Sequence, residues 1–131
     1  MSFQCPPNDA QQLLSSPGHV YLDVRTSSEF EAYHVPGSFN IPCFETGGGY
    51  GLEPVEEFVE NVRETFGDPD MAPTFIVGCK IGQRSLAGMG RLRDVGYNAV
   101  NLDGGIDTWA AMGLPIEYVE AEGGNADDLF L

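Results

Sequence analysis

TFIVGCKIGQRS, residues 74–85, joins a short apolar run to a segment of helical character through a loop that begins with a cysteine. The run 74–77 is continuously apolar, which is typical of a central strand covered on both faces. A helix is expected to follow over about 85–95. Backbone N–H groups of such a loop, together with the helix N-terminus, can hold an anion. The stretch therefore predicts a strand, an anion-binding loop and a helix.

Cys79 is the candidate nucleophile of this loop. Attack by sulfur requires the thiolate, which an electropositive loop favours. The chain has 6 Lys and Arg against 20 Asp and Glu, yet its single lysine is Lys80, and Arg84 follows closely. The alternative is that Cys79 is a small apolar residue that closes a buried strand, since free cysteines are often buried. The scarce cations beside it favour the catalytic interpretation.

The composition as a whole indicates one globular domain. The chain has 131 residues, 42% of them hydrophobic, which is enough for a substantial core. A net charge of −14 argues against nucleic acid and anionic membranes as partners. No apolar stretch approaches the length of a membrane span, and residues 1–7 do not resemble a secretory signal. We expect a soluble intracellular protein with one domain over 1–131, a core over about 18–116 and an acidic tail over 117–131.

The cysteine pattern bears on redox compartment and on metals. Cys5, Cys43 and Cys79 are widely spaced, which favours a reduced compartment over a disulfide-linked secreted domain. The closely paired Cys or His ligands of a structural zinc site are missing from the sequence. We therefore predict no metal and no cofactor, and no part for Cys5 or Cys43 in the chemistry.

Apolar periodicity and turn residues predict the other elements. Strands or extended segments are expected at 3–5, 19–24, 39–42 and 99–102, and helices at 10–14, 29–33, 52–66 and 106–112. The glycine-rich segment 45–51 is assigned to a loop rather than a phosphate cradle, because no Gly-Lys-Ser/Thr follows it. Alternating strands and helices predict an α/β fold with a mainly parallel central sheet and helices on both faces. Ligands bind outside the carboxyl ends of such strands, where segments 23–25, 79–85 and 103–105 are expected to meet.

Two interpretations are open for several residues near this edge. Asp23 and Arg25 either support the loop from the neighbouring strand or form a surface ion pair worth about 0–1 kcal/mol. Arg84 either attracts an anionic ligand or braces the loop by pairing with a carboxylate. His34 is interpreted as a turn or core hydrogen-bonding residue rather than a general base. Trp109 is interpreted as a core anchor.

An ordered set of motifs resembles a rhodanese domain. The set comprises Leu22-Asp23-Val24-Arg25, Glu29-Phe30, the run 34–42, the Cys79 loop, Gly96-Tyr97, Gly104-Gly105-Ile106, Trp109 and the run 113–116. The resemblance covers about 18–116. The run 75–79, with the glycine-rich insert before Leu52, is similar to the single-domain sulfurtransferases of plants and algae. The fold that this implies is rhodanese-like.

The resemblance implies a sulfurtransferase that carries sulfur as a persulfide on Cys79. The sulfur would come from thiosulfate or a related small anionic donor and pass to cyanide or a thiol, with glutathione and thioredoxin as candidate acceptors. Backbone N–H groups of the loop would hold the persulfide anion, and Lys80 and Arg84 would attract the donor. The loop residues concerned are Lys80, Ile81, Gly82, Gln83, Arg84 and Ser85. A location in the chloroplast or the cytoplasm is also implied.

Two other functions remain open from the sequence. Related phosphatases and arsenate reductases use Cys-x5-Arg, whereas four residues separate Cys79 from Arg84, which favours sulfur over phosphate. Gly78 stands where many family members have an aromatic residue or histidine, which further weakens the phosphatase interpretation. The second alternative is a non-catalytic or persulfide-sensing interaction module. The intact cysteine loop counts against a module without catalysis.

Overall fold

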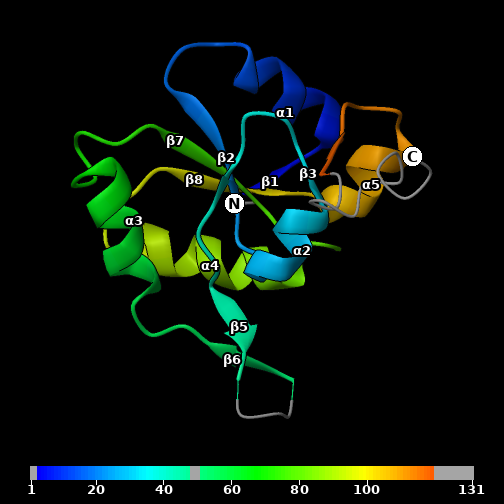
Figure 1. The fold of residues 1–131 in the computed structure, drawn as a ribbon. Helices are drawn as coiled ribbons and strands as arrows, with labels where there is room; N and C mark the ends of the chain where they lie inside the picture. Colours follow the sequence, from blue (N-terminus) through cyan, green and yellow to red (C-terminus); the bar gives the residue numbers. More distant parts are fainter. Residues whose placement is uncertain (1–2, 48–50, 120–131) are drawn as a thin grey trace, which may run out of the picture.

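Strand β7 (Thr74–Gly78) lies at the centre of a five-stranded sheet, between β8 (Ala99–Leu102) and β2 (His19–Asp23). The edge strands are β1 (Gln4–Cys5), next to β8, and β4 (Phe39–Asn40), next to β2. All four pairings are parallel, which confirms the predicted α/β fold. The computed structural model describes residues 3–47 and 51–119 (Figure 1).

Two clusters of buried side chains lie on opposite faces of this sheet. Side chains alternate along β7, so Phe75 and Val77 enter one cluster while Ile76 enters the other. Burial on both faces explains the continuous apolar run of the sequence. The first cluster includes residues of α3 (Phe58–Phe66) and α4 (Gln83–Asp94), and the second includes residues of α1 (Pro7–Leu14) and α5 (Gly105–Ala111). Figure 1 shows α1 across the sheet from α3 and α4.

The segment before α3 differs from the prediction. The expected helix over 52–66 was wrong in its first part, because Leu52–Pro54 forms strand β6, which pairs antiparallel with β5 (Phe44–Thr46). The prediction of a loop over 45–51 was wrong at 45–46 for the same reason, and residues 48–50 lie outside the described residues. The Val55 N–H donates to the carbonyl of Cys43 at 3.0 Å, which extends this hairpin contact. Figure 1 shows the hairpin projecting away from the sheet.

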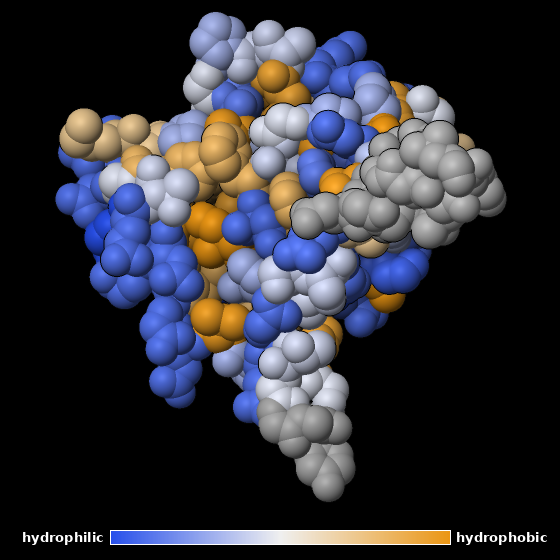
Figure 2. Space-filling model, viewed as in Figure 1, coloured by the Kyte–Doolittle hydropathy of each residue, from blue (hydrophilic) through white to orange (hydrophobic). Residues whose placement is uncertain are grey.

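Residues 55–57 are not helical either, and the predicted helix is present from Phe58 onward, as α3. Helix α3 buries Phe58 and Val62, whereas Glu60 and Glu64 are exposed. This is the amphipathic pattern of a helix that covers a core on one side. Figure 2 shows the hydrophilic surface on this side of the molecule.

Helix α2 (Ser27–Ala32) begins two residues before the predicted start. Its N-cap is Thr26. Thr26 Oγ1 accepts the N–H of Glu29, and the Glu29 carboxylate accepts the N–H of Thr26, which together form a capping box. The helix ends at Ala32, and strand β3 (Tyr33–His34) follows it directly.

Part of the predicted acidic tail is ordered as a strand. The short strand β9 (Glu117–Tyr118) pairs antiparallel with β3 and so joins the tail to the domain. The rest of that tail, residues 120–131, lies outside the described residues. Among the helices of the described residues, none combines the length and the apolar character needed to cross a bilayer.

Candidate active site

The Cys79 loop lies where the carboxyl ends of the strands meet the start of α5. Strand β2 continues into this edge, since the Val24 N–H donates to the carbonyl of Gly78 at 3.0 Å. The N–H of Ile106 donates to the carbonyl of Cys79 at 2.8 Å, and the N–H of Asp107 to that of Lys80 at 3.0 Å. The segments expected to converge at this edge are therefore brought together.

Glycines allow the loop and α5 to approach backbone to backbone. Gly105 has a φ of +68°, and a Cβ on it would overlap the carbonyl group of Lys80. Gly82, the N-cap of α4, has a φ of +104°, which side chains disfavour. The sharp turn at Gly82 starts α4 at Gln83, two residues before the predicted start.

Cys79 is 1% exposed, and its sulfur faces two hydrogen-bond donors. The N–H of Gly82 lies with its nitrogen 3.1 Å from Cys79 Sγ, and Ser85 Oγ lies 3.2 Å from the same sulfur. Hydrogen bonds to the charged form of a group favour that form. The geometry is therefore suited to a sulfur that carries negative charge.

Asn101 orients Ser85, a role that the sequence analysis missed. Its Oδ1 lies 2.5 Å from Ser85 Oγ, while its Nδ2 donates to the carbonyl of Gly82 at 3.2 Å and to Gln4 Oε1 at 3.0 Å. A hydroxyl has one proton, and the 2.5 Å contact with an amide oxygen places that proton between Ser85 and Asn101. Ser85 can donate to an anionic Cys79 sulfur, 3.2 Å away, by turning its proton from Asn101 to the sulfur. The sequence signal was a buried polar residue within the apolar strand β8.

The two cations of the loop both have carboxylate partners. Arg84 forms a two-pronged pair with Glu29, with Nη1–Oε1 at 2.7 Å and Nη2–Oε2 at 3.0 Å. Arg84 is therefore paired with a carboxylate, as in the interpretation in which it braces the loop. These hydrogen bonds lower the pKa of Glu29 from 4.5 to about 2. Lys80 Nζ lies 2.8 Å from Asp107 Oδ2, with both side chains about half exposed.

The remaining loop side chains point outward. Ile81 is 56% exposed, and Gln83 is exposed as well. Their side chains therefore do not enclose the sulfur.

Asp23 and Arg25 form a buried ion pair. The interpretation of this pair as a surface ion pair was therefore wrong. Both side chains are 1% exposed, and Arg25 Nη2 lies 2.8 Å from Asp23 Oδ2. Arg25 also donates to the carbonyl of Tyr33 at 2.6 Å. The Asn40 side chain donates to the carbonyls of Asp23 and Arg25, each at 3.0 Å. The pair fixes the turn that follows β2, immediately beside Gly78.

The other two cysteines are buried thiols. Cys43 Sγ donates to the carbonyl of Arg84 at 3.4 Å, beneath the loop. Burial raises the pKa of Cys43 to about 12, and the nearby Cys79 adds to this increase. Burial also raises the pKa of Cys5.

His34 lies in a local contact with α2. Its Nδ1 lies 2.8 Å from the carbonyl oxygen of Phe30, and the His34 and Phe30 rings stack with centroids 3.9 Å apart.

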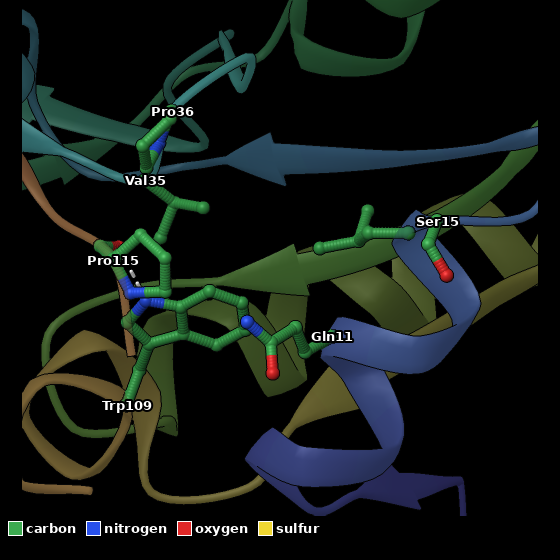
Figure 3. Close-up of a pocket in the computed structure, with 7 residues that line it drawn as sticks. Gln11, Ser15, Val35, Pro36, Trp109 and Pro115 are labelled. Carbon is green, nitrogen blue, oxygen red and sulfur yellow. Dashed lines mark hydrogen bonds between the residues drawn. The ribbon is translucent and has the colours of Figure 1, made fainter. Parts of the chain in front are cut away.

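A cavity of about 230 Å³ lies apart from this loop, between α1 and α5. Figure 3 shows Trp109 in its wall, with the indole N–H donating to the carbonyl of Pro115 at 2.7 Å. Trp109 is only 2% exposed and belongs to the second core cluster, as expected of an anchor. The cavity is lined by Gln11, Leu14, Ser15, Val35, Pro36, Trp109 and Pro115, so the Cys79 loop does not contribute to it.

Comparisons with known proteins agree with this architecture. A rhodanese-like domain model matches residues 6–112. The chain is 39% identical over 99 residues to thiosulfate sulfurtransferase 16, chloroplastic, of Arabidopsis thaliana, covering 75% of this chain and 79% of the relative. It is 36% identical over 118 residues to thiosulfate sulfurtransferase 18 of the same plant, covering 88% and 83%.

A solved structure shows the same fold. The rhodanese-related protein of Thermoplasma volcanium superposes with a TM-score of 0.63 at 25% identity, over 87% of this chain and 96% of that one. The family match covers most of the chain, and relatives more than 30% identical are matched over most of their own length. The protein belongs to the family of rhodanese-like domains.

Proposed function

We propose that this protein is a sulfurtransferase that carries sulfane sulfur as a persulfide on Cys79. The observation that supports the proposal most directly is the pair of donors at 3.1 and 3.2 Å from the Cys79 sulfur. A persulfide is an anion, and preorganised donors stabilise such a charge in an active site. The names of both plant relatives, thiosulfate sulfurtransferases, agree with this chemistry.

The reaction proceeds in two displacements. The Cys79 thiolate attacks the outer sulfur of thiosulfate, the S–S bond breaks, and the electron pair leaves with sulfite. Cys79 then carries a persulfide anion beside the N–H of Gly82. A thiolate or cyanide attacks the outer sulfur and the S–S bond to Cys79 breaks. A thiolate acceptor becomes a persulfide, cyanide becomes thiocyanate, and Cys79 returns as a thiolate. Glutathione and thioredoxin are the proposed thiol acceptors.

The location and partners follow from the same proposal. We place the protein in the chloroplast or the cytoplasm, and the name of one relative includes the word chloroplastic. The net charge of −14 disfavours binding to nucleic acid or to anionic membranes. The partners are therefore the small donor and the thiol or cyanide acceptor.

Intact-protein mass spectrometry tests the proposal. Wild type, Cys79→Ser and the matched control Cys43→Ser are incubated with thiosulfate while sulfite release is measured. We expect one added sulfur on wild type and on Cys43→Ser, none on Cys79→Ser, and its removal by cyanide or a thiol. Absence of an adduct on wild type with thiosulfate and with other sulfane donors would contradict the proposal. An adduct that forms but never turns over would instead indicate a persulfide sensor.

A further inference from the structure

The two cations beside Cys79 differ in how firmly they are paired. The Arg84 and Glu29 side chains are 19% and 30% exposed and meet through two parallel hydrogen bonds. The Lys80 and Asp107 side chains are 52% and 44% exposed and meet through a single contact. A bidentate ion pair at a partly buried site is more stable than an exposed ion pair of lysine with a single contact. Lys80 can therefore turn towards a ligand, whereas Arg84 stays on Glu29.

Glu29 is held on its other side as well. Its Oε1 accepts the N–H and the hydroxyl of Thr26, each at 3.0 Å, through the capping box of α2. The carboxylate is thus fixed by the helix start before it meets Arg84. Movement of Glu29 away from Arg84 would break these helix contacts too.

The pairing changes the charge that an incoming donor meets. The Arg84–Glu29 pair and the buried Asp23–Arg25 pair are each neutral overall. The whole chain carries a net charge of −14. Attraction of an anion depends on its charge, and a dianion suffers twice the repulsion of a monoanion from the acidic surface.

We infer that Glu29 is a positioning residue for donor choice: through Arg84 it reduces the positive charge beside Cys79, and so lowers the preference of the site for dianionic thiosulfate relative to singly charged sulfane donors. The inference rests on the proposed function, because it requires Cys79 to accept the sulfur. The singly charged donors concerned carry a terminal sulfur on a group with one negative charge, as in thiosulfonates and alkyl persulfides.

Methanethiosulfonate is the probe for this class. The Cys79 thiolate attacks its terminal sulfur, the S–S bond breaks, and methanesulfinate leaves with the electron pair. The products are the Cys79 persulfide anion and a monoanion. The sulfane chemistry thus matches that of thiosulfate while the donor carries one charge less.

The experiment compares the two donors on wild type and Glu29→Gln. Glutamine also satisfies the third position of a capping box, so the start of α2 is retained. Persulfide formation is followed by quenched intact mass spectrometry over a range of donor concentrations. We expect Glu29→Gln to raise kcat/KM for thiosulfate relative to methanethiosulfonate about fivefold, mainly through KM. The thiosulfate value should also fall more steeply with added salt, because the freed Arg84 attracts the dianion.

Two further variants separate this role from a general change in charge or folding. Glu31→Gln removes the same charge from an exposed position on α2 and is expected to leave the donor ratio unchanged. The double variant Glu29→Gln/Arg84→Gln restores the charge balance of wild type, and its donor ratio is expected to return to the wild-type value.

An unchanged ratio and salt dependence in folded Glu29→Gln would overturn the inference, as would an equal change in Glu31→Gln. If Glu29→Gln fails to fold, a double variant with an altered donor ratio would likewise overturn it. Absence of a persulfide on wild type with either donor would instead overturn the proposed function.

Discussion

The phenol oxygen of Tyr21 occupies the space that a side chain on Gly78 would need. A Cβ built on Gly78 would overlap the hydroxyl and ring of Tyr21, which reaches across from the neighbouring strand. Tyr21 is 2% exposed, and its ring meets Trp109 edge-on with centroids 6.0 Å apart. Residue 78 must therefore be glycine, because the Tyr21 ring on β2 fills the space that a side chain there would need.

Gly78→Ala is expected to lower the free energy of unfolding by about 1–3 kcal/mol, because the added methyl group overpacks this site. Tyr21→Leu in the same chain should recover part of the loss by vacating the space. Urea denaturation of the single and double variants provides the measurement. If Gly78→Ala alone matches wild type in stability, the overlap with Tyr21 does not constrain this position.

Ser85→Ala is expected to slow sulfur loading by about 10- to 100-fold, since a hydrogen bond to a charged group contributes about 1.5–3 kcal/mol. The rate of persulfide formation from thiosulfate is measured by quenched mass spectrometry, with the near-UV circular dichroism spectrum as the test of folding. Leu86→Ala, an exposed change on the next residue of α4, is the matched control. Equal rates for Ser85→Ala and wild type would exclude donation from Ser85 to the sulfur.

Two glycines of α4 should respond to alanine in opposite directions. A Cβ on Gly90 meets no atom within 4 Å, so Gly90→Ala should raise stability by about 0.5–1 kcal/mol through helix propensity. A Cβ on Gly88 would lie 3.2 Å from Cys43 Sγ, so Gly88→Ala should lower stability. Thermal unfolding of both variants checks the contrast. Stabilisation by both changes would show that Gly88 is not needed for close packing.

Glu29 should make stability depend on pH in the acid range. Its pKa is lowered from 4.5 to about 2 in the folded protein, so the ionised group stabilises the fold at pH above 4.5. That contribution is lost as the pH falls from 4.5 through about 2. Glu29→Gln should be less stable than wild type at pH 7, by roughly 1 kcal/mol, with the difference shrinking towards pH 2. Denaturant unfolding at a series of pH values checks this, and a difference that is constant with pH would contradict it.

Cys43 should be unreactive at neutral pH although it is a free thiol. With its pKa raised to about 12, almost none of it is thiolate at pH 8, and it is buried. Iodoacetamide should leave Cys43 unmodified in the folded protein and modify all three cysteines in denaturant, as peptide mass spectrometry would show. Rapid alkylation of Cys43 in the folded state would contradict both its burial and its lack of a chemical role.

The parts of the fold and site that the sequence predicted are those set by local patterns. The apolar run 74–77 and the glycine-containing loop after it identify a buried strand, a turn and a helix start from neighbouring residues alone. The hairpin of β5 and β6 was missed because it depends on contacts such as that between Cys43 and Val55, which helical spacing cannot reveal. The partner of Arg84 was missed as well, because Glu29 is 55 positions away in the chain.

Residue 29 combines two tasks with different chemical tolerances. The start of α2 accepts either glutamate or glutamine at this position, whereas only glutamate neutralises Arg84. Codons for these two amino acids differ by a single nucleotide. One nucleotide change can thus alter the electrostatics next to Cys79 while the helix start is preserved, and under the role proposed for Glu29 the same change would shift donor preference within an otherwise constant scaffold.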